Sequence, residues 1–165
     1  MSSKTPKVRQ INYIAIIPHL IIMAGMVWLW YQIYPENAFL FGAITYILTS
    51  FILRNLISKD HRNGIKNNNS ENYKEAISDF EKSYTFFSKH EWVDKYRMVT
   101  LLSSSKMSYR EMALANIGYC YSQIGDGNKA KEYYERTLKE FPGSGLAKSA
   151  LNMMNSVEQT PSSKN

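Results

Sequence analysis

The sequence predicts an all-α protein in which a transmembrane pair of helices precedes a short array of amphipathic helices. Two observations indicate this fold class: the first third of the chain holds two long stretches with almost no charge, and the last two thirds repeat apolar residues at helical spacing. A length of 165 residues leaves room for one modest domain beside such an anchor. The single cysteine, Cys120, excludes an intrachain disulfide and a cysteine-based zinc site, so we expect apolar packing to hold the core.

The two apolar stretches are residues 11–34 and residues 38–57. The first has no formal charge, and the second has only Arg54, whose long side chain we expect to reach the lipid head groups. Because ~20 helical residues cross the ~30 Å hydrocarbon core of a bilayer, both stretches are candidate spans. The three residues between them include a proline and a charge, so residues 11–57 are expected to form an antiparallel transmembrane hairpin.

Basic residues flank both outer ends of the hairpin, whereas its turn carries only Glu36. These flanking residues are Lys4, Lys7, Arg9, Arg54, Lys59, Arg62 and Lys66. The positive-inside rule therefore predicts a multi-pass protein of the cell membrane with both termini cytoplasmic, residues 1–10 forming a basic cytoplasmic N-terminus. A cleaved signal peptide is the alternative, but its apolar region is shorter and ends in small residues, while this one ends in bulky aromatic residues.

Two features inside the spans have alternative interpretations. Gly42, Thr45 and Thr49 form a narrow face of small residues, which we interpret as close packing against the first span rather than a polar path through the membrane. His19 is an ionisable residue at membrane depth, so a haem-handling or proton-handling role is one alternative. The spans offer it no second histidine or carboxylate, which favours a neutral His19 bonded to a backbone carbonyl that Pro18 leaves free.

The sequence pattern of a helix–turn–helix unit occurs twice in the last two thirds of the chain. Gly64 precedes Ala76 by 12 residues and Gly118 precedes Ala130 by 12, and an aromatic residue follows each alanine four positions later. Apolar residues at helical spacing run through the second helix of each copy: Tyr73, Ala76, Ile77, Phe80, Tyr84 and Phe87 in the first, and Ala130, Tyr133, Tyr134, Leu138 and Phe141 in the second.

The second copy, residues 111–144, resembles the tetratricopeptide repeat family. That family has a small residue in its first helix, an alanine and an aromatic residue in its second, and a closing proline. The residues that carry the resemblance are Leu114, Ile117, Gly118, Tyr121, Gly125, Ala130, Tyr134 and Pro142. Because Gly118 and Ala130 are small where the two helices cross, larger rings can fill the space on either side.

The first copy, residues 57–90, departs from the family pattern. Asn63 and Asn67 replace large apolar residues, and a serine replaces the proline. We therefore expect residues 58–66 to prolong the second membrane helix, with residues 67–70 forming the turn.

The sequence leaves open whether residues 91–110 form a helix of their own or lengthen neighbouring helices. A final amphipathic helix follows Pro142, where such arrays carry a capping helix. Residues 58–158 are thus assigned to a cytoplasmic domain that resembles a tetratricopeptide array, and residues 159–165 to a flexible tail. Since two repeats bury too little surface alone, the inserted and capping helices, the membrane end or a homodimer must supply the rest.

No catalytic arrangement is recognisable in the sequence. The motifs HExxH, GxxxxGK[ST] and GxGxxG are absent, and His19, His61 and His90 lie far apart. We interpret Cys120 as a small buried residue rather than a reactive thiol. The expectation is a protein without enzymatic activity, cofactor or metal. Its net charge of +6 is concentrated beside the membrane, so it indicates orientation rather than nucleic-acid binding.

The resemblance implies a partner-binding function, because tetratricopeptide arrays hold a peptide or a partner helix on a concave face lined by the first helix of each repeat. The implied partner-binding residues are Ala115, Asn116, Tyr119, Ser122 and Gln123, with positive charge from Arg62 and Lys66. A full carboxylate clamp is not expected, since Leu146 and Ala150 stand where it needs basic residues. Contact with lipid head groups is the alternative role for Arg62 and Lys66.

We therefore expect a membrane-anchored adaptor or scaffold whose partners are a protein or peptide, on the concave face of the array, and the lipid bilayer. One alternative is an accessory subunit of an integral membrane complex that assembles through its hairpin. A haem-handling or proton-handling membrane protein acting through His19 is a further alternative.

Overall fold

The computed structural model describes residues 13–159, and all regular elements within this range are helices, which confirms the all-α class. The predicted N-terminus, residues 1–10, and nearly all of the predicted tail lie outside the described residues. The described chain divides into two compact units. The first holds residues 13–57 and 92–108, and the second holds residues 58–91 and 109–159.

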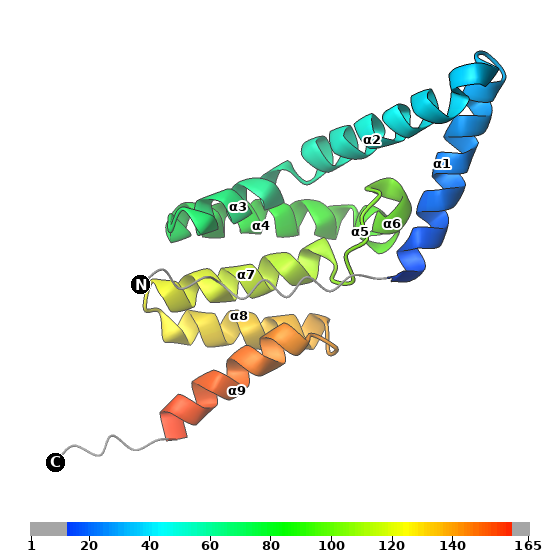
Figure 1. Ribbon diagram of the computed structural model, residues 1–165. Helices are drawn as coiled ribbons and strands as arrows, with labels where there is room; N and C mark the ends of the chain where they lie inside the picture. Colours follow the sequence, from blue (N-terminus) through cyan, green and yellow to red (C-terminus); the bar gives the residue numbers. More distant parts are fainter. Residues whose placement is uncertain (1–12, 160–165) are drawn as a thin grey trace. The chain divides into compact units, whose positions relative to one another are not determined.

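A pair of apolar helices dominates the first unit. The 3-10 helix η1 (Tyr13–Ala15) runs directly into α1 (Ile16–Tyr31), and η2 (Pro35–Asn37) leads into α2 (Ala38–Ile57), which packs back along α1 (Figure 1). The helical stretch Pro35–Ile57 has 23 residues and a mean hydropathy of 1.6, so by length and composition it is long enough to cross a membrane. With 16 residues, α1 is shorter than that, and the predicted two-helix transmembrane hairpin is therefore not confirmed.

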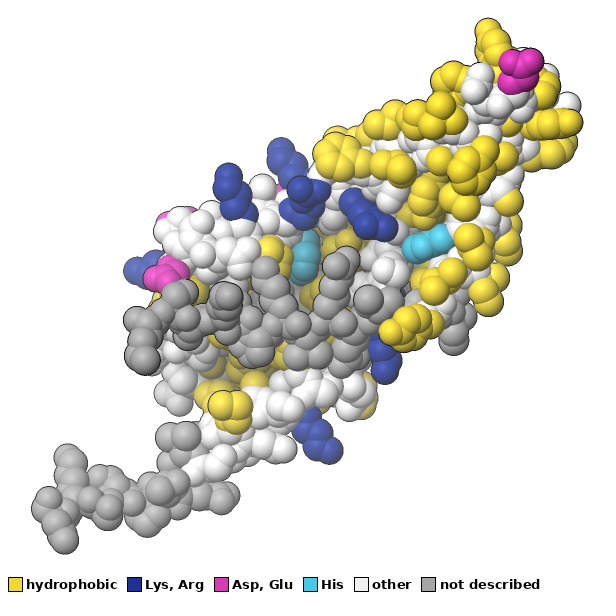
Figure 2. Space-filling view, in the orientation of Figure 1, with side chains coloured by type: hydrophobic (Ala, Val, Ile, Leu, Met, Phe, Trp, Pro, Cys, Tyr) yellow, Lys and Arg dark blue, Asp and Glu magenta, His cyan; other side chains and the backbone are white. Residues whose placement is uncertain are grey.

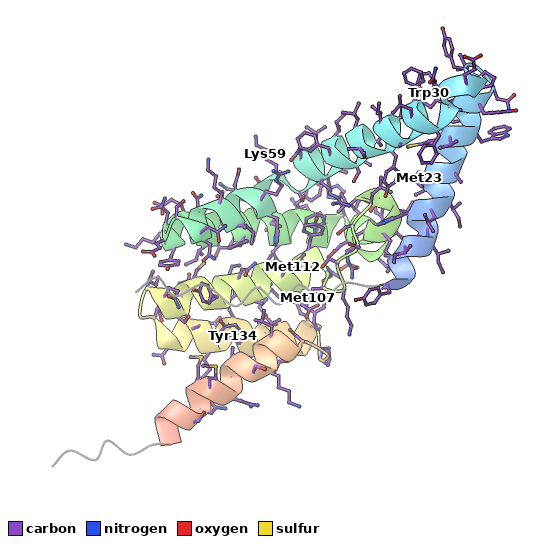
Figure 3. All side chains as sticks on the ribbon, in the orientation of Figure 1. Met23, Trp30, Lys59, Met107, Met112 and Tyr134 are labelled. Atoms are coloured by element: carbon purple, nitrogen blue, oxygen red, sulfur yellow. The ribbon has the colours of Figure 1, made fainter. Side chains whose placement is uncertain are left out.

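The face of small residues on α2 packs against α1. A Cβ atom added to Gly42 would lie 2.6 Å from Cγ2 and 2.8 Å from Cα of Val27, so only a glycine lets the two backbones approach this closely. Trp30, near the turn of the pair (Figure 3), donates its indole N–H to Thr45 Oγ1 at 3.0 Å. The predicted close packing is confirmed at Gly42 and Thr45.

Residues 91–110 begin with two short helices of their own, α5 (Glu91–Lys95) and α6 (Arg97–Thr100). The Arg97 guanidinium holds the loop that follows by donating to backbone carbonyl oxygens. These belong to Asp94 at 3.0 Å, Ser105 at 3.1 Å and Lys106 at 2.6 Å. Most of this segment packs in the first unit. The predicted cytoplasmic domain, residues 58–158, instead includes it with the helical array.

Two polar side chains of the apolar pair hold this inserted segment. His19 Nε2 donates to the carbonyl oxygen of Met98 at 3.0 Å, and Arg54 Nε donates to that of Leu101 at 3.2 Å. The Arg54 guanidinium also donates to the carbonyl oxygen of Leu102. The carbonyl freed by the proline beside His19 is therefore the wrong partner, whereas the reach of Arg54 to the lipid head groups stays a prediction. Both side chains bind the backbone of a segment that is distant in the sequence.

The second unit is a row of five helices in which each helix packs against the next (Figure 1). In order they are α3 (Lys59–Asn69), α4 (Tyr73–Lys89), α7 (Tyr109–Gln123), α8 (Gly127–Glu140) and α9 (Gly145–Gln159). The predicted capping helix is confirmed as α9, whose Ala147 and Leu151 pack on Ala130 and Tyr134 of α8.

The expectation that residues 58–66 prolong the second apolar helix is wrong. Ser58 leaves the helical conformation, with φ −101° and ψ 29°, and α3 then runs through most of the predicted turn, to Asn69. Two of the asparagines expected to form the turn bind neighbouring helices instead. Asn67 donates to Asp79 Oδ2 of α4 at 2.8 Å, and Asn68 Oδ1 lies 3.5 Å from Cys120 Sγ of α7.

Both helix pairs of the array pack closely at a glycine, which the sequence predicts for Gly118, where two helices cross. A Cβ atom at Gly64 would lie 2.7 Å from ring carbons of Phe80, and one at Gly118 would lie 3.1 Å from the ring of Tyr134 (Figure 3). The aromatic ring of the second helix therefore lies against the bare backbone of the first. Between the two pairs, α4 and α7 share a core of Ala76, Ile77, Phe80, Ala113, Ile117 and Cys120.

The two helix pairs end their first helices with the same turn but different residues. Gly125 has φ +81° after α7, and Glu71 has φ +62° after α3. In both turns the next residue donates its amide to a carbonyl five positions back, Asn72 to Asn67 at 2.9 Å and Asp126 to Tyr121 at 3.0 Å. Glu71 thus occupies a left-handed conformation that favours glycine.

We expect Glu71→Gly to raise the free energy of unfolding by about 1 kcal/mol, because glycine removes the left-handed strain. The reciprocal variant Gly125→Ala is the matched control and should lower it by about the same amount. Chemical denaturation of the full chain in detergent, followed by circular dichroism, measures both. A destabilised Glu71→Gly variant would show that the Glu71 side chain stabilises the fold by more than its left-handed backbone conformation destabilises it.

Candidate partner-binding site

The predicted partner-binding residues lie on α3 and α7, the first helices of the two pairs. Asn116 and Tyr119 are half-buried on α7, and Ser122 and Gln123 are exposed toward its C-terminal end. Ala115 is only 1% exposed, so its methyl group has no free surface to offer a partner. The accessible part of the α7 set is therefore polar, with one aromatic ring.

Tyr119 is the aromatic member of this set. Its ring packs against the core between α4 and α7. Burial raises the pKa of its phenol, and the nearby Tyr73 and Glu71 act in the same direction. The hydroxyl consequently stays neutral and can donate a hydrogen bond to a partner. Tyr73 and Glu71 border this site but were not among the predicted residues, because nothing in their local sequence marks them.

Arg62 and Lys66 lie on the exposed side of α3, and Lys59 precedes them at helical spacing. None of the three forms an ion pair with another residue in the described part of the chain, and Figure 2 shows dark blue side chains gathered over α3. Arg62 and Lys66 border a shallow, open depression together with Ile65, Asn69 and Ser70. No α7 residue borders it, so the structure does not bring the basic pair and the α7 set into one pocket.

The opposite face of α3 carries a buried histidine. His61 lies edge-on to the rings of Phe80 and Tyr109, with centroid separations of 5.5 and 5.1 Å, and its Nδ1 is 3.3 Å from Ser83 Oγ. Burial lowers the pKa of His61 from 6.5 to about 4, so the imidazole is neutral near neutral pH. It joins α3, α4 and α7 and has no exposed edge for a substrate.

Cys120 is buried, as predicted, and burial raises its pKa to about 12. A thiol with so high a pKa is protonated at physiological pH and is a poor nucleophile. Among the described residues, no group of three or more His, Cys, Asp or Glu side chains could hold a metal ion.

The neutral state of His61 predicts a pH dependence of stability. The folded pKa of about 4 lies below the ordinary 6.5, so between these values the unfolded chain binds more protons than the folded one. Stability should therefore be complete above pH 6.5 and fall by up to about 3 kcal/mol as the pH drops to about 4.

Denaturation across this pH range measures the effect of His61. His61→Gln should flatten the dependence, while the matched control His90→Gln, at an exposed histidine, should keep it. An unchanged dependence in His61→Gln would assign the acid sensitivity to other groups.

The comparisons with known proteins identify one part of this array. Residues 113–142, which cover most of α7, all of α8 and the closing Pro142, match the tetratricopeptide repeat family. No curated protein and no solved structure matches the chain. The chain therefore contains a tetratricopeptide repeat at residues 113–142, within a row of five helices.

Proposed function

We propose that this chain is a membrane-anchored adaptor that binds a protein or peptide partner at the cytoplasmic face of the cell membrane. The observation that carries the proposal is the combination, in one chain, of a tetratricopeptide repeat with a helix long and apolar enough to cross a bilayer. Tetratricopeptide repeats are typically non-catalytic interaction modules, and anchoring one raises the local concentration of its partner at the membrane.

The surface of α1 and α2 supports the anchor. No residue of α1 is buried, and in α2 only Ala38 and Gly42 are. Large apolar side chains such as Phe39, Phe51 and Leu56 are exposed, and Figure 2 shows apolar side chains covering this pair. Water-soluble proteins rarely expose an apolar surface of this extent, which lipid would cover.

The combined length of η1 and α1 supports two spans rather than one. The 16 residues of α1 extend ~24 Å, and the three residues of η1 add ~6 Å. The total approaches the ~30 Å thickness of the hydrocarbon core. The turn carries the acidic Glu36 and the far end of α2 leads into the basic face of α3, so the positive-inside rule orients the array toward the cytoplasm.

The two alternative functions have less support. Assembly of a membrane complex through the small residues of α2 would need that face to be free, but Gly42 and Thr45 pack against α1. A haem-handling or proton-handling role would need His19 to face a ligand, but its Nε2 donates to Met98.

The anchor predicts that the full chain stays in the membrane pellet after alkaline carbonate extraction, because its attachment is apolar rather than ionic. Gly42→Leu should weaken helix pairing and increase extraction, since its side chain would meet the backbone of Val27. The matched control is Gly25→Leu on α1, where a Cβ atom would meet nothing within 4 Å. Complete release of the unaltered chain by carbonate would contradict the proposed anchor.

The α7 surface predicts where the partner binds. The double variant Asn116→Ala and Gln123→Ala should recover about tenfold less partner from detergent-solubilised membranes, the effect of losing ~1.4 kcal/mol of contact free energy. The control variant, Glu132→Ala with Lys139→Ala, removes exposed side chains of α8 instead. Both variants keep the full chain, because residues 92–108 pack with the apolar helices and a truncation would remove their support. Partner loss with the α8 variant alone would place the binding surface elsewhere.

A further inference from the structure

The short helices α5 and α6 carry an exposed aromatic face. Trp92, Tyr96 and Val99 are 61%, 56% and 52% exposed and recur at spacings of four and three residues. The amide of Tyr96 bonds to the carbonyl of Trp92, and that of Val99 to the carbonyl of Tyr96, so helical geometry keeps the three side chains on one side. Val93 is buried on the other side.

The hydrogen bonds of the first unit fix the level of this segment along the apolar pair. His19, in the first turn of α1, holds Met98, and Arg54, in the last turn of α2, holds Leu101 and Leu102. Since the helices are antiparallel, these turns lie at the same, open end of the pair (Figure 1). The segment is therefore attached where both helices would leave the hydrocarbon core.

Tryptophan and tyrosine prefer the level of the lipid head groups, where the ring is partly in lipid and its polar atom stays hydrated. At the closed end of the pair, this level is occupied by Trp28, Tyr31 and Tyr34, all exposed. The 20 residues of α2 separate the two ends by ~30 Å, the thickness of the hydrocarbon core. The aromatic residues of the first unit thus fall at both interfaces of a bilayer that the pair would span.

The exposed lysine on this segment fits the same location. Lys95 is exposed between Trp92 and Tyr96, and its ammonium group lies 5.7 Å from the centroid of the Tyr96 ring. A lysine at this level can extend to lipid phosphate while its aliphatic part lies on apolar surface. The segment consequently combines aromatic rings with a basic group, and both favour the head-group region.

We propose that the face formed by Trp92, Tyr96 and Val99 lies in the cytoplasmic lipid–water interface, as a second membrane contact beside the apolar pair. The proposal rests on the membrane anchor proposed above. Its consequence is that residues 58–91 are joined in the chain to a membrane contact at each of their ends, whereas α7, α8 and α9 follow the second contact.

Tryptophan fluorescence tests this placement in the full chain. The variant Trp28→Phe, Trp30→Phe leaves Trp92 as the sole tryptophan and is reconstituted in phosphatidylcholine vesicles with bromine atoms near the glycerol end or near the methyl end of the acyl chains. We expect Trp92 to lose more fluorescence with bromines near the glycerol end, and to lose little with aqueous iodide. If this variant does not fold, the fluorescence difference between the unaltered chain and Trp92→Phe measures the same quantity.

A matched control places the sole tryptophan on the second unit. In that chain Trp28, Trp30 and Trp92 are replaced by Phe and Met153, which is 70% exposed on α9, by Trp. Iodide should quench it and brominated lipid should not.

Each other outcome overturns the placement in a distinguishable way. Quenching of Trp92 by iodide, in a chain that resists carbonate extraction from the same vesicles, refutes the interfacial face and leaves the anchor intact. Shielding from both quenchers assigns the face to a second copy or a protein partner. Extraction of the chain by carbonate refutes the anchor and this inference together.

Discussion

The array depends on the close approach of paired helices across a glycine. In each pair an aromatic ring lies on a backbone that carries no side chain, Phe80 on Gly64 and Tyr134 on Gly118. This contact brings the helices near enough for small residues such as Ala76 and Ala130 to be fully buried. The same packing presents the other sides of α3 and α7 to solvent, so the geometry that stabilises the array also creates its candidate binding surface.

Polar side chains connect the segments that the glycine contacts do not reach. His19 and Arg54 would be costly within an apolar helix pair, but each satisfies its donors on backbone carbonyls of the inserted segment. Arg97 in turn closes the loop after α6. The insertion is therefore a folded part of the first unit, and its aromatic face is held at the end of the apolar helices rather than on a free loop.

The two sides of α3 differ in burial and in charge. The face with Gly64 and the neutral His61 packs on α4 and α7, where a charge would be expensive. The other face presents Lys59, Arg62 and Lys66, which lack ion-pair partners among the described residues. This basic face follows the apolar helix α2 directly in the chain.

The sequence by itself determined the features that depend on local spacing. These include the all-α class, the close approach of two helices at Gly118, the capping helix, the burial of Cys120 and the turn at Gly125, because periodicity and side-chain size act over a few turns of helix. Only the tertiary structure decided the break at Ser58, the two short helices of the insertion and the partners of His19 and Arg54. The hydrogen bonds of these two side chains join residues 79 and 47 positions apart, a separation that no local pattern records.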